Sequence, residues 1–265
     1  MKNVVTIAGS DSCGGAGIQA DLKTFSALET YGMSVITAIT AQNTTGVLMV
    51  RDLDVEIVRE QLKALFDDIE IHAVKIGMVS NIDIIDTIGD CLKSYQAHPV
   101  VLDPVMVSKS GSHLLHPDSK DRLIEVLFPL AEVVTPNLFE AEVITGDKIE
   151  TIQEMEQAAV KIHQLGARHV VVKGGHLSGD AIDVLYNGKE FIHLKGKRIH
   201  TRNTHGTGCT FSSAIAAYLA RGYSITDAVY QAKEYINGAI KHSLPLGHGV
   251  GPTHHFYDLY TRARQ

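Results

Sequence analysis

Short apolar runs alternate with helically spaced apolar residues along most of the chain. Val4 to Ala8 is a predominantly apolar run typical of a buried strand, and the apolar positions from Ile18 to Leu28 then recur at the spacing of one helix face. Further strands are predicted at Ser34 to Ala41, Ala73 to Met78, Val100 to Val105, Glu132 to Thr135 and His169 to Lys173, with helical patterns following most of them. This order predicts an α/β fold: a three-layer α-β-α sandwich around a central, mostly parallel sheet.

The chain departs from this alternation after residue 180. Two predicted strands, Ile182 to Tyr186 and Phe191 to Leu194, flank an Asn-Gly dipeptide, which favours a tight β-hairpin turn. Two long helices are predicted to follow, at Gly208 to Ala220 and Thr226 to His242. Since no Pro-rich linker, repeat or low-complexity tract divides the sequence, we expect a single domain over residues 1–265.

The composition excludes several classes of protein. There are 24 Lys and Arg against 30 Asp and Glu, a formal net charge of −6, which is the opposite of the basic balance of nucleic-acid-binding proteins. Hydrophobic residues make up 45% of the chain, enough for a large core. No stretch approaches the roughly 20 apolar residues of a membrane-spanning helix, and the N-terminus lacks the apolar core of a signal peptide. We therefore expect neither nucleic acid nor a membrane as a partner.

The cysteines and histidines form no familiar disulfide or metal pattern. Cys13, Cys91 and Cys209 are odd in number and include no Cys-x-x-Cys pair. The 14 His include the adjacent His254 and His255 but no His-x-x-x-His set with a carboxylate. We therefore expect reduced thiols and a cytoplasmic location, and these residues match no zinc motif.

One candidate anion site precedes a predicted helix. The segment Gly206-Thr207-Gly208-Cys209-Thr210 would present its backbone N–H groups at the helix N-terminus, which attracts anions. Its two glycines would let the backbone approach an anion closely. An isolated Gly-Thr-Gly is also compatible with an ordinary glycine-rich helix entry, but the polar residues just before it favour binding.

The first loop contains many glycines but matches neither common nucleotide motif. Gly9 to Gly17 lacks the Gly-Lys-Ser/Thr ending of a Walker A loop and the Gly-x-Gly-x-x-Gly spacing of dinucleotide folds. On the helix that follows, Asp21 could meet a ligand amine. It could equally be a solvated helix position.

Charged residues stand at three other strand ends, where open α/β sheets bind their ligands. Asn137 and Glu140 are three residues apart on one face of a short predicted helix, and Asp103 follows another strand. These carboxylates could hold a hard cation that bridges phosphates. Lys173 ends a further strand, where it could neutralise phosphate charge. Each residue alone also fits an ordinary cap or a solvated side chain.

Taken together in order, these motifs are similar to those of the ribokinase-like superfamily over nearly the whole chain. The segments that carry the resemblance are Thr6 to Thr24, Thr37 to Thr44, Val74 to Met78, Leu102 to Val107, Thr135 to Gly146, Val172 to His176 and Asn203 to Thr210. Within that superfamily they most resemble the hydroxymethylpyrimidine and phosphomethylpyrimidine kinases of thiamin biosynthesis.

This resemblance implies a reaction and a set of binding residues. ATP would phosphorylate 4-amino-5-hydroxymethyl-2-methylpyrimidine and then its monophosphate. The resemblance implies that the pyrimidine meets Gly9, Asp21, Gln42, Met78 and Val105. It implies that ATP lies along Asn137, Lys173, Gly174, Gly175, His176, Asp183, Gly208 and Lys233, and that Asp103 and Glu140 organise Mg²⁺. Gln42 suits an aminopyrimidine because its amide both donates and accepts hydrogen bonds.

The resemblance also implies a base. Most of the superfamily has an Asp after the Gly-x-Gly, and here Cys209 would take the proton of the acceptor alcohol, supported by Gly206, Thr207 and Gly208. Because a helix N-terminus stabilises a thiolate, we expect the pKa of this thiol to lie near neutrality. We expect the segment from Ser108 to His116 to act as a mobile lid.

Two other functions stay open. One subset of pyridoxal and pyridoxine kinases resembles the same family, but Gln42 favours a pyrimidine. The resemblance also implies that a B6 kinase of this kind would carry a Cys in its lid, where this chain has Ser108. A non-catalytic nucleotide-binding sensor is disfavoured because Cys209, Glu140 and Lys173 are all present. Related kinases are commonly dimers, so we expect a homodimer.

Overall fold

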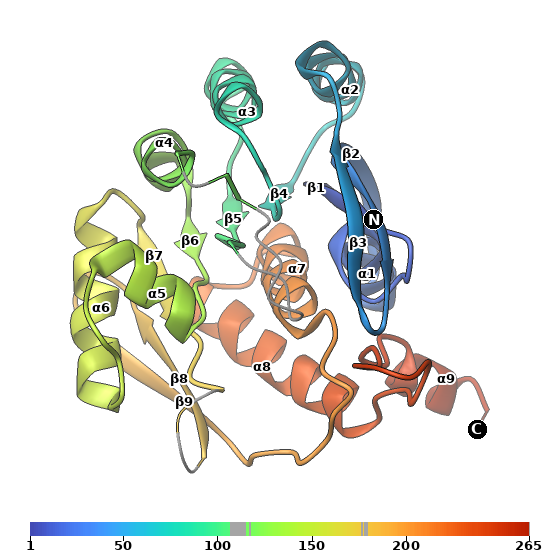
Figure 1. Cartoon of the computed structure of the whole chain (residues 1–265), viewed down its shortest axis with the longest axis vertical. Coiled ribbons are helices and arrows are strands. Elements are labelled where there is room, and N and C mark those ends of the chain that lie inside the picture. The colour runs from blue at the N-terminus through green and yellow to red at the C-terminus, as the bar shows by residue number, and fades with distance from the viewer. Residues whose placement is uncertain (107–114, 117, 176, 178–179, 265) are drawn as a thin grey trace.

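The computed structural model describes residues 1–106, 115–116, 118–175, 177 and 180–264. Nine strands within these residues form one sheet in the order β3-β2-β1-β4-β5-β6-β7-β8-β9 (Figure 1). The strands are β1 (Lys2–Asp11), β2 (Thr30–Asn43), β3 (Gly46–Asp52), β4 (Ala73–Ile76), β5 (Val100–Leu102), β6 (Val133–Val134), β7 (His169–Val172), β8 (Ala181–Tyr186) and β9 (Phe191–Gly196). Strands β2, β1, β4, β5, β6 and β7 pair in parallel, whereas β3, β8 and β9 pair antiparallel to their neighbours.

Helices cover both faces of this sheet (Figure 1). One face packs against α1 (Gly17–Ala27), α7 (Thr207–Ala220) and α8 (Ile225–Lys241), and the other against α2 (Val55–Phe66), α3 (Ile82–Ser94), α4 (Lys120–Leu127), α5 (Leu138–Thr145) and α6 (Ile152–Gln164). The short helices η1 (Phe128–Leu130) and α9 (Tyr257–Arg262) complete the described helices. Alternation along β1 explains the two layers: Val4 joins the core beneath α7, while Val5 and Ile7 join the core beneath α2 and α3. The predicted three-layer α-β-α sandwich is confirmed.

The structure adds four elements to those predicted: β3, α6, α9 and the short η1. Strand β3 contains the apolar run Val47 to Val50 and could have been recognised, although its side chains at Leu48, Met49 and Val50 are exposed. Helix α9 is short and has no buried residue. Helix α6 could have been recognised, because Thr151 and Glu154 form a capping box in front of apolar residues at helical spacing.

The sheet brings the predicted functional segments to one edge. Because β1, β4, β5, β6 and β7 are parallel, the segments that follow their carboxyl ends meet there. Asp103 follows β5, Asn137 follows β6 by three residues, and Lys173 follows β7. In the part of the chain that the structure describes, no helix combines the length and apolar character needed to cross a membrane.

Candidate active site

A cleft of about 850 Å³ opens at this edge of the sheet. It brings together most of the predicted site residues, which come from nearly every part of the chain. Those that line it are Gly9, Gln42, Met78, Asp103, Val105, Asn137, Glu140, Lys173, Gly175, Asp183, Gly206, Thr207, Gly208, Cys209 and Lys233. Asp21 and Gly174 do not line it. His176 and most of the expected lid, residues 108–114, lie outside the described residues.

The predicted anion loop forms the entry to α7. Gly206 is the N-cap residue and has a φ of +78°, a left-handed conformation that favours glycine. A Cβ atom there would lie 1.7 Å from the carbonyl oxygen of Gly15, so the first loop and the anion loop touch at this point. Thr207 Oγ1 donates a hydrogen bond to the Thr204 carbonyl over 2.8 Å, which orders the first turn. Thr207, Gly208 and Cys209 of that turn line the cleft, and a helix N-terminus attracts anions.

The thiol of Cys209 does not have the acidity expected from its helix position. Burial raises its pKa to about 11, the charge of Lys75 opposes this, and the charges of Asp21 and Asp103 reinforce it. The expectation of a pKa near neutrality is thus wrong for the free protein, because burial outweighs the helix N-terminus. In the free protein the Cys209 thiol is therefore protonated at neutral pH.

Asp21 lies beneath the cleft rather than in it. Its carboxylate is fully buried and accepts hydrogen bonds from Thr6 Oγ1 and Ser213 Oγ, both over 2.6 Å. It also forms an ion pair with Lys75, with an Nζ to Oδ2 distance of 2.9 Å. These partners engage both carboxylate oxygens, which accounts for the absence of Asp21 from the lining of the cleft.

Lys75 is a charged residue that the sequence analysis did not identify. It sits in β4, in the centre of the sheet, is fully buried, and still lines the cleft. Burial alone would lower its pKa, but the charge of Asp21 raises it to about 12. Lys75 is therefore a permanent cation beneath Cys209. Its place within an apolar strand hid it from pattern analysis.

A second Lys–Asp pair borders the cleft. Lys173 Nζ lies 2.7 Å from Asp103 Oδ1, which also accepts a hydrogen bond from Thr135 Oγ1 over 3.0 Å. Burial would lower the pKa of Lys173, but the charges of Asp103 and Glu140 outweigh it and raise the pKa. A Cβ atom added to Gly208 would lie 3.4 Å from both members of the pair. The glycine thus places the pair against the anion loop.

Asn137 and Glu140 form a capping box at the start of α5. The Glu140 N–H donates to Asn137 Oδ1 over 2.9 Å, and the Asn137 N–H donates to Glu140 Oε2 over 2.8 Å. Burial raises the pKa of Glu140 to about 7, although the charge of Lys173 opposes the shift. The charge of Asp103 adds to the increase, which shows that the two carboxylates are neighbours.

These carboxylates fit a magnesium ion. Mg²⁺ commonly uses one or two protein carboxylates together with substrate phosphate oxygens. Asp103 and Glu140 are 2% and 3% exposed, and Lys173 is their shared cation. One positive charge thus faces two buried carboxylates, so a further cation would relieve their repulsion.

The far wall of the cleft carries a third ion pair. Lys233 Nζ, on α8, lies 2.7 Å from Asp183 Oδ2, on β8. Asp183 Oδ1 accepts the Gly174 N–H over 2.9 Å. A Cβ atom on Gly174 would lie 1.9 Å from the Ile182 carbonyl oxygen. Gly174 therefore allows close packing of the strands, and it is Gly175 that reaches the cleft.

Another part of the cleft carries small and apolar residues together with an amide side chain. Gly9, Met78 and Val105 line it, and a Cβ atom on Gly9 would lie 3.1 Å from the Met78 sulfur. Gln42 supplies the amide, with its Oε1 accepting a hydrogen bond from Thr40 Oγ1 over 3.2 Å. The Gln42 amide nitrogen is the polar group suited to a ring acceptor there.

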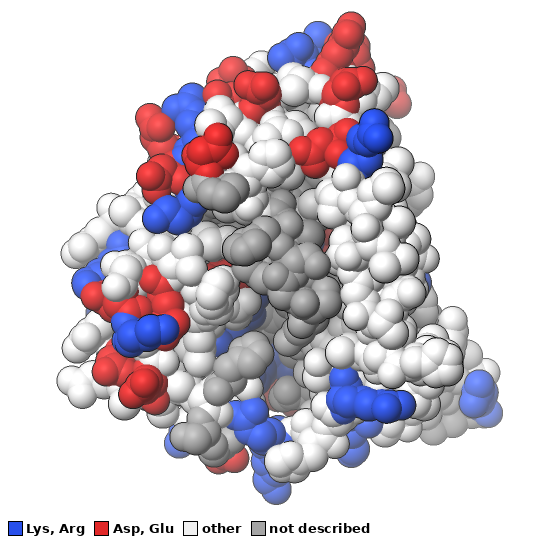
Figure 2. Space-filling model, viewed as in Figure 1, with Lys and Arg blue, Asp and Glu red and all other residues white. Residues whose placement is uncertain are grey.

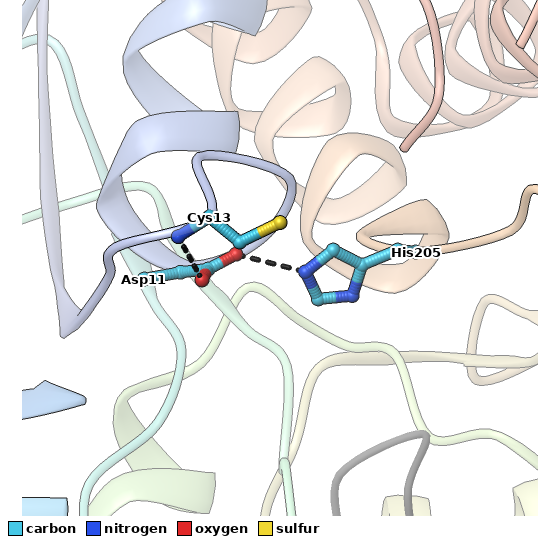
Figure 3. Close-up of side chains that lie close together, drawn as sticks. All are labelled: Asp11, Cys13 and His205. Carbon is cyan, nitrogen blue, oxygen red and sulfur yellow. Dashed lines mark hydrogen bonds and ion pairs between the residues drawn. The ribbon is translucent and has the colours of Figure 1, made fainter. Parts of the chain in front are cut away.

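Asp11 is a further residue that sequence analysis missed, and its partner His205 is one of the polar residues noted just before the anion loop. The Asp11 carboxylate accepts hydrogen bonds from the backbone N–H groups of Cys13, Gly15 and Ala16 over 2.8 to 3.0 Å. It also lies 2.8 Å from His205 Nε2, so it joins the first loop to the segment before α7 (Figure 3). The two partners are 194 positions apart, so their contact left no signal in the sequence.

Comparisons with known proteins agree on the kind of protein this chain resembles. The sequence profile of the family described as Phosphomethylpyrimidine kinase matches residues 11–254. The hydroxymethylpyrimidine/phosphomethylpyrimidine kinase of Rhizobium meliloti is 54% identical over 96% of each chain. The thiamine biosynthesis bifunctional protein ThiED of Geobacter sulfurreducens is 50% identical over 96% of this chain, which spans 52% of that protein's length. The structure of an ADP complex of Bacillus subtilis pyridoxal kinase, 46% identical, covers 97% of this chain and 98% of its own with a TM-score of 0.91.

Proposed function

Because the chain belongs to the phosphomethylpyrimidine kinase family, we propose that it phosphorylates 4-amino-5-hydroxymethyl-2-methylpyrimidine with ATP and then phosphorylates the resulting monophosphate. Both reactions belong to thiamin biosynthesis. The observation that carries the proposal is the position of Cys209 at the N-terminus of α7, in a cleft that Gly9, Met78 and Val105 line together with a set of buried charges. That arrangement suits an acceptor alcohol on one side and a polyphosphate on the other.

The residues of the charged end would hold and neutralise the phosphates. The N–H groups of Gly208 and its neighbours would bind the transferred phosphoryl group, and Lys173 would offset its charge. Asp103 and Glu140 would hold Mg²⁺, which supplies further positive charge to the phosphates when bound. Asn137, Gly175 and the Lys233–Asp183 pair would lie along the rest of the nucleotide. His176 is assigned the same role by resemblance alone.

In the part of the cleft lined by Gly9, Met78 and Val105, the side chains would orient the pyrimidine. Gln42 would bind the aminopyrimidine edge, while Gly9, Met78 and Val105 would contact the ring. Asp21 would act indirectly, by fixing Lys75 beneath the reacting groups. The hydroxyl oxygen would then attack the γ-phosphorus of ATP, the bond to the β-phosphate oxygen would break, and the hydroxyl proton would pass to Cys209 Sγ.

The raised pKa of Cys209 constrains this mechanism. Only a minor fraction of the thiol is ionised at neutral pH, since its pKa is about 11 in the free protein. The Lys75 ammonium and the first turn of α7 stabilise that fraction. A small thiolate fraction suffices because positioning and charge neutralisation provide most of the catalysis of phosphoryl transfer. We therefore expect kcat to rise between pH 7 and pH 9.

The direct test is a pair of cysteine variants. Cys209→Ala should lower kcat by roughly 10²-fold or more and abolish the rise with pH, since a positioned base is lost. Cys91, in α3 on the opposite face of the sheet, provides the matched control. Cys91→Ala should retain the wild-type kcat and its rise with pH. Steady-state assays with Mg-ATP across this pH range measure the effect. Near-normal turnover of Cys209→Ala would refute the assignment of the base.

A B6 vitamer is the second candidate acceptor. It is favoured by the TM-score of 0.91 to the Bacillus subtilis pyridoxal kinase. Values of kcat/KM for the hydroxymethylpyrimidine, its monophosphate and pyridoxal would rank the acceptors. A preference for pyridoxal above about tenfold, or 1.4 kcal/mol of transition-state stabilisation, would overturn the first choice. Activity on none of them would favour the nucleotide sensor.

A homodimer is also part of the proposal. Figure 2 shows a surface without Lys, Arg, Asp or Glu over β2 and β3. Among its apolar side chains, Leu48 is 76% exposed and Met49 is 63% exposed. Exposed apolar residues on an edge strand are suited to pairing with a second copy. Light scattering should give twice the chain mass of 28.8 kDa, and a mass of one chain would contradict the dimer.

A further inference from the structure

Three side chains with different ligand atoms converge beside the cleft: Asp11, Cys13 and His205 (Figure 3). A carboxylate oxygen, a thiol sulfur and an imidazole nitrogen all lie within 4.8 Å of one another. Asp11 ends β1, Cys13 follows it in the glycine-rich loop, and His205 immediately precedes the anion loop. This set of oxygen, sulfur and nitrogen is separate from the carboxylates proposed for Mg²⁺.

The carboxylate of this cluster is held in place by the backbone. Asp11 accepts N–H groups from three residues of the loop, so its orientation does not depend on His205 alone. Asp11 and His205 are almost fully buried and line the cleft, while Cys13 is half-buried. An ion could therefore enter from the cleft and find one side of the site still open.

We propose that Asp11, Cys13 and His205 form a binding site for a zinc-like divalent cation. Zn²⁺ binds thiolate sulfur at about 2.3 Å and imidazole nitrogen or carboxylate oxygen at about 2.0 to 2.2 Å. In tetrahedral geometry these bonds place the ligand atoms roughly 3.3 to 3.8 Å apart, which lies within the 4.8 Å limit of the cluster. The 2.8 Å between His205 Nε2 and Asp11 Oδ2 must widen when an ion enters. Three protein ligands leave the fourth position for water on the cleft side. Mg²⁺ would avoid the site because it prefers an all-oxygen environment.

Binding has a defined proton balance. The Cys13 thiol loses its proton to solvent when its sulfur binds the ion. His205 Nε2 now faces Asp11 Oδ2 at 2.8 Å, and it must present its lone pair to the ion with the ring proton on Nδ1. One proton is released for each ion bound, so affinity rises with pH. The ion replaces the direct link between the two loops with three coordinate bonds.

Cobalt titration of the metal-depleted full chain tests the site. We expect one equivalent of Co²⁺ to produce the d–d bands of a tetrahedral ion and a thiolate-to-cobalt charge-transfer band, and Zn²⁺ to remove both. Cys13→Ser should abolish the charge-transfer band and weaken Zn²⁺ binding at least tenfold. His205→Gln, whose amide can still donate to Asp11, should weaken binding similarly. Zn²⁺ should also raise Tm in the wild type, because it binds the folded chain.

The other two cysteines provide matched controls. Cys209→Ser and Cys91→Ser should keep the charge-transfer band and the stoichiometry of one ion. A band that survives Cys13→Ser, or that disappears in Cys209→Ser, would overturn the proposal because the ligand would then be a different thiol. The absence of any thiolate band in the wild type would overturn it as well. None of these readouts depends on kinase activity.

Discussion

Two Lys–Asp pairs flank Cys209, and they differ in how they meet the cleft. Both partners of the Lys75–Asp21 pair are 0% exposed, and the Asp21 oxygens are fully engaged by protein groups. The Lys173–Asp103 pair has a similar short contact, yet the Lys173 side chain is 15% exposed and adjoins Glu140. Protein groups satisfy the first pair without a ligand, whereas the second pair lies beside another carboxylate and can interact with a ligand in the cleft. The same two residue types thus fix an electrostatic background in one place and offer charge to a ligand in the other.

The largest expected effect is on stability. Lys75→Met should lower the free energy of unfolding by about 3 to 5 kcal/mol, because it leaves the Asp21 charge buried without its cation. Lys173→Met should lower it by less, since Asp103 lines the cleft and water can approach it once the lysine side chain is removed. Urea unfolding of both variants measures the difference. Equal losses would remove the distinction between the two pairs.

The second effect is on turnover, where Lys173 is expected to matter more than Lys75. Lys173→Met should reduce kcat by roughly 10²- to 10³-fold, as expected when one preorganised charge at a developing charge is removed. Lys173→Arg, which keeps the charge, should recover part of the loss. Assays must be run where each variant is folded, as checked by circular dichroism. Normal turnover in Lys173→Met would contradict its role at the phosphates.

The third effect is a pH dependence of stability in the absence of nucleotide and metal. Burial raises the pKa of Glu140 from its usual 4.5 to about 7, so the folded state retains this proton more strongly than the unfolded state does. Stability should therefore fall as pH rises from about 4.5 to about 7, by an amount on the order of 3 kcal/mol. In Glu140→Gln this component should vanish. A wild-type slope that persists unchanged in Glu140→Gln would assign the proton to another group.

The smallest effect is expected at an exposed pair that serves as a reference. Lys161 Nζ lies 2.5 Å from Asp147 Oδ2, and both side chains are about half-exposed. Lys161→Met should change the free energy of unfolding by less than about 1 kcal/mol and leave kcat unaltered. A loss as large as that of Lys75→Met would show that burial does not separate these pairs.

Sequence patterns identified the cleft pair more completely than the buried one. Lys173 and Asp103 stand where apolar strands end, so their polarity contrasts with their neighbours. Lys75 lies inside an apolar strand, and the carboxylate of Asp21 turns toward the buried side of α1. Periodicity alone cannot tell a solvated carboxylate from one that a distant lysine neutralises, because the partner is 54 residues away.

The acidity of Cys209 shows a second limit. The sequence places the thiol at a helix N-terminus, which by itself favours the thiolate. Its depth in the protein and the nearby Asp21 and Asp103 reverse the direction of the pKa shift. By contrast, the element order and the sheet layers were predictable, since they follow from local periodicity. The charges around the site depend on contacts between residues far apart in sequence.

The hydrogen bonds that complete the cleft also bear on how the chain matures during synthesis. Asp11 is joined to His205 and Asp21 to Ser213, pairs separated by 194 and 192 residues. A nascent chain can form much of the sheet before the anion loop and Ser213, whose hydroxyl donates to Asp21, have been synthesised. The cleft therefore becomes complete only when the last part of the chain leaves the ribosome. A truncated translation product would lack the means to transfer a phosphoryl group.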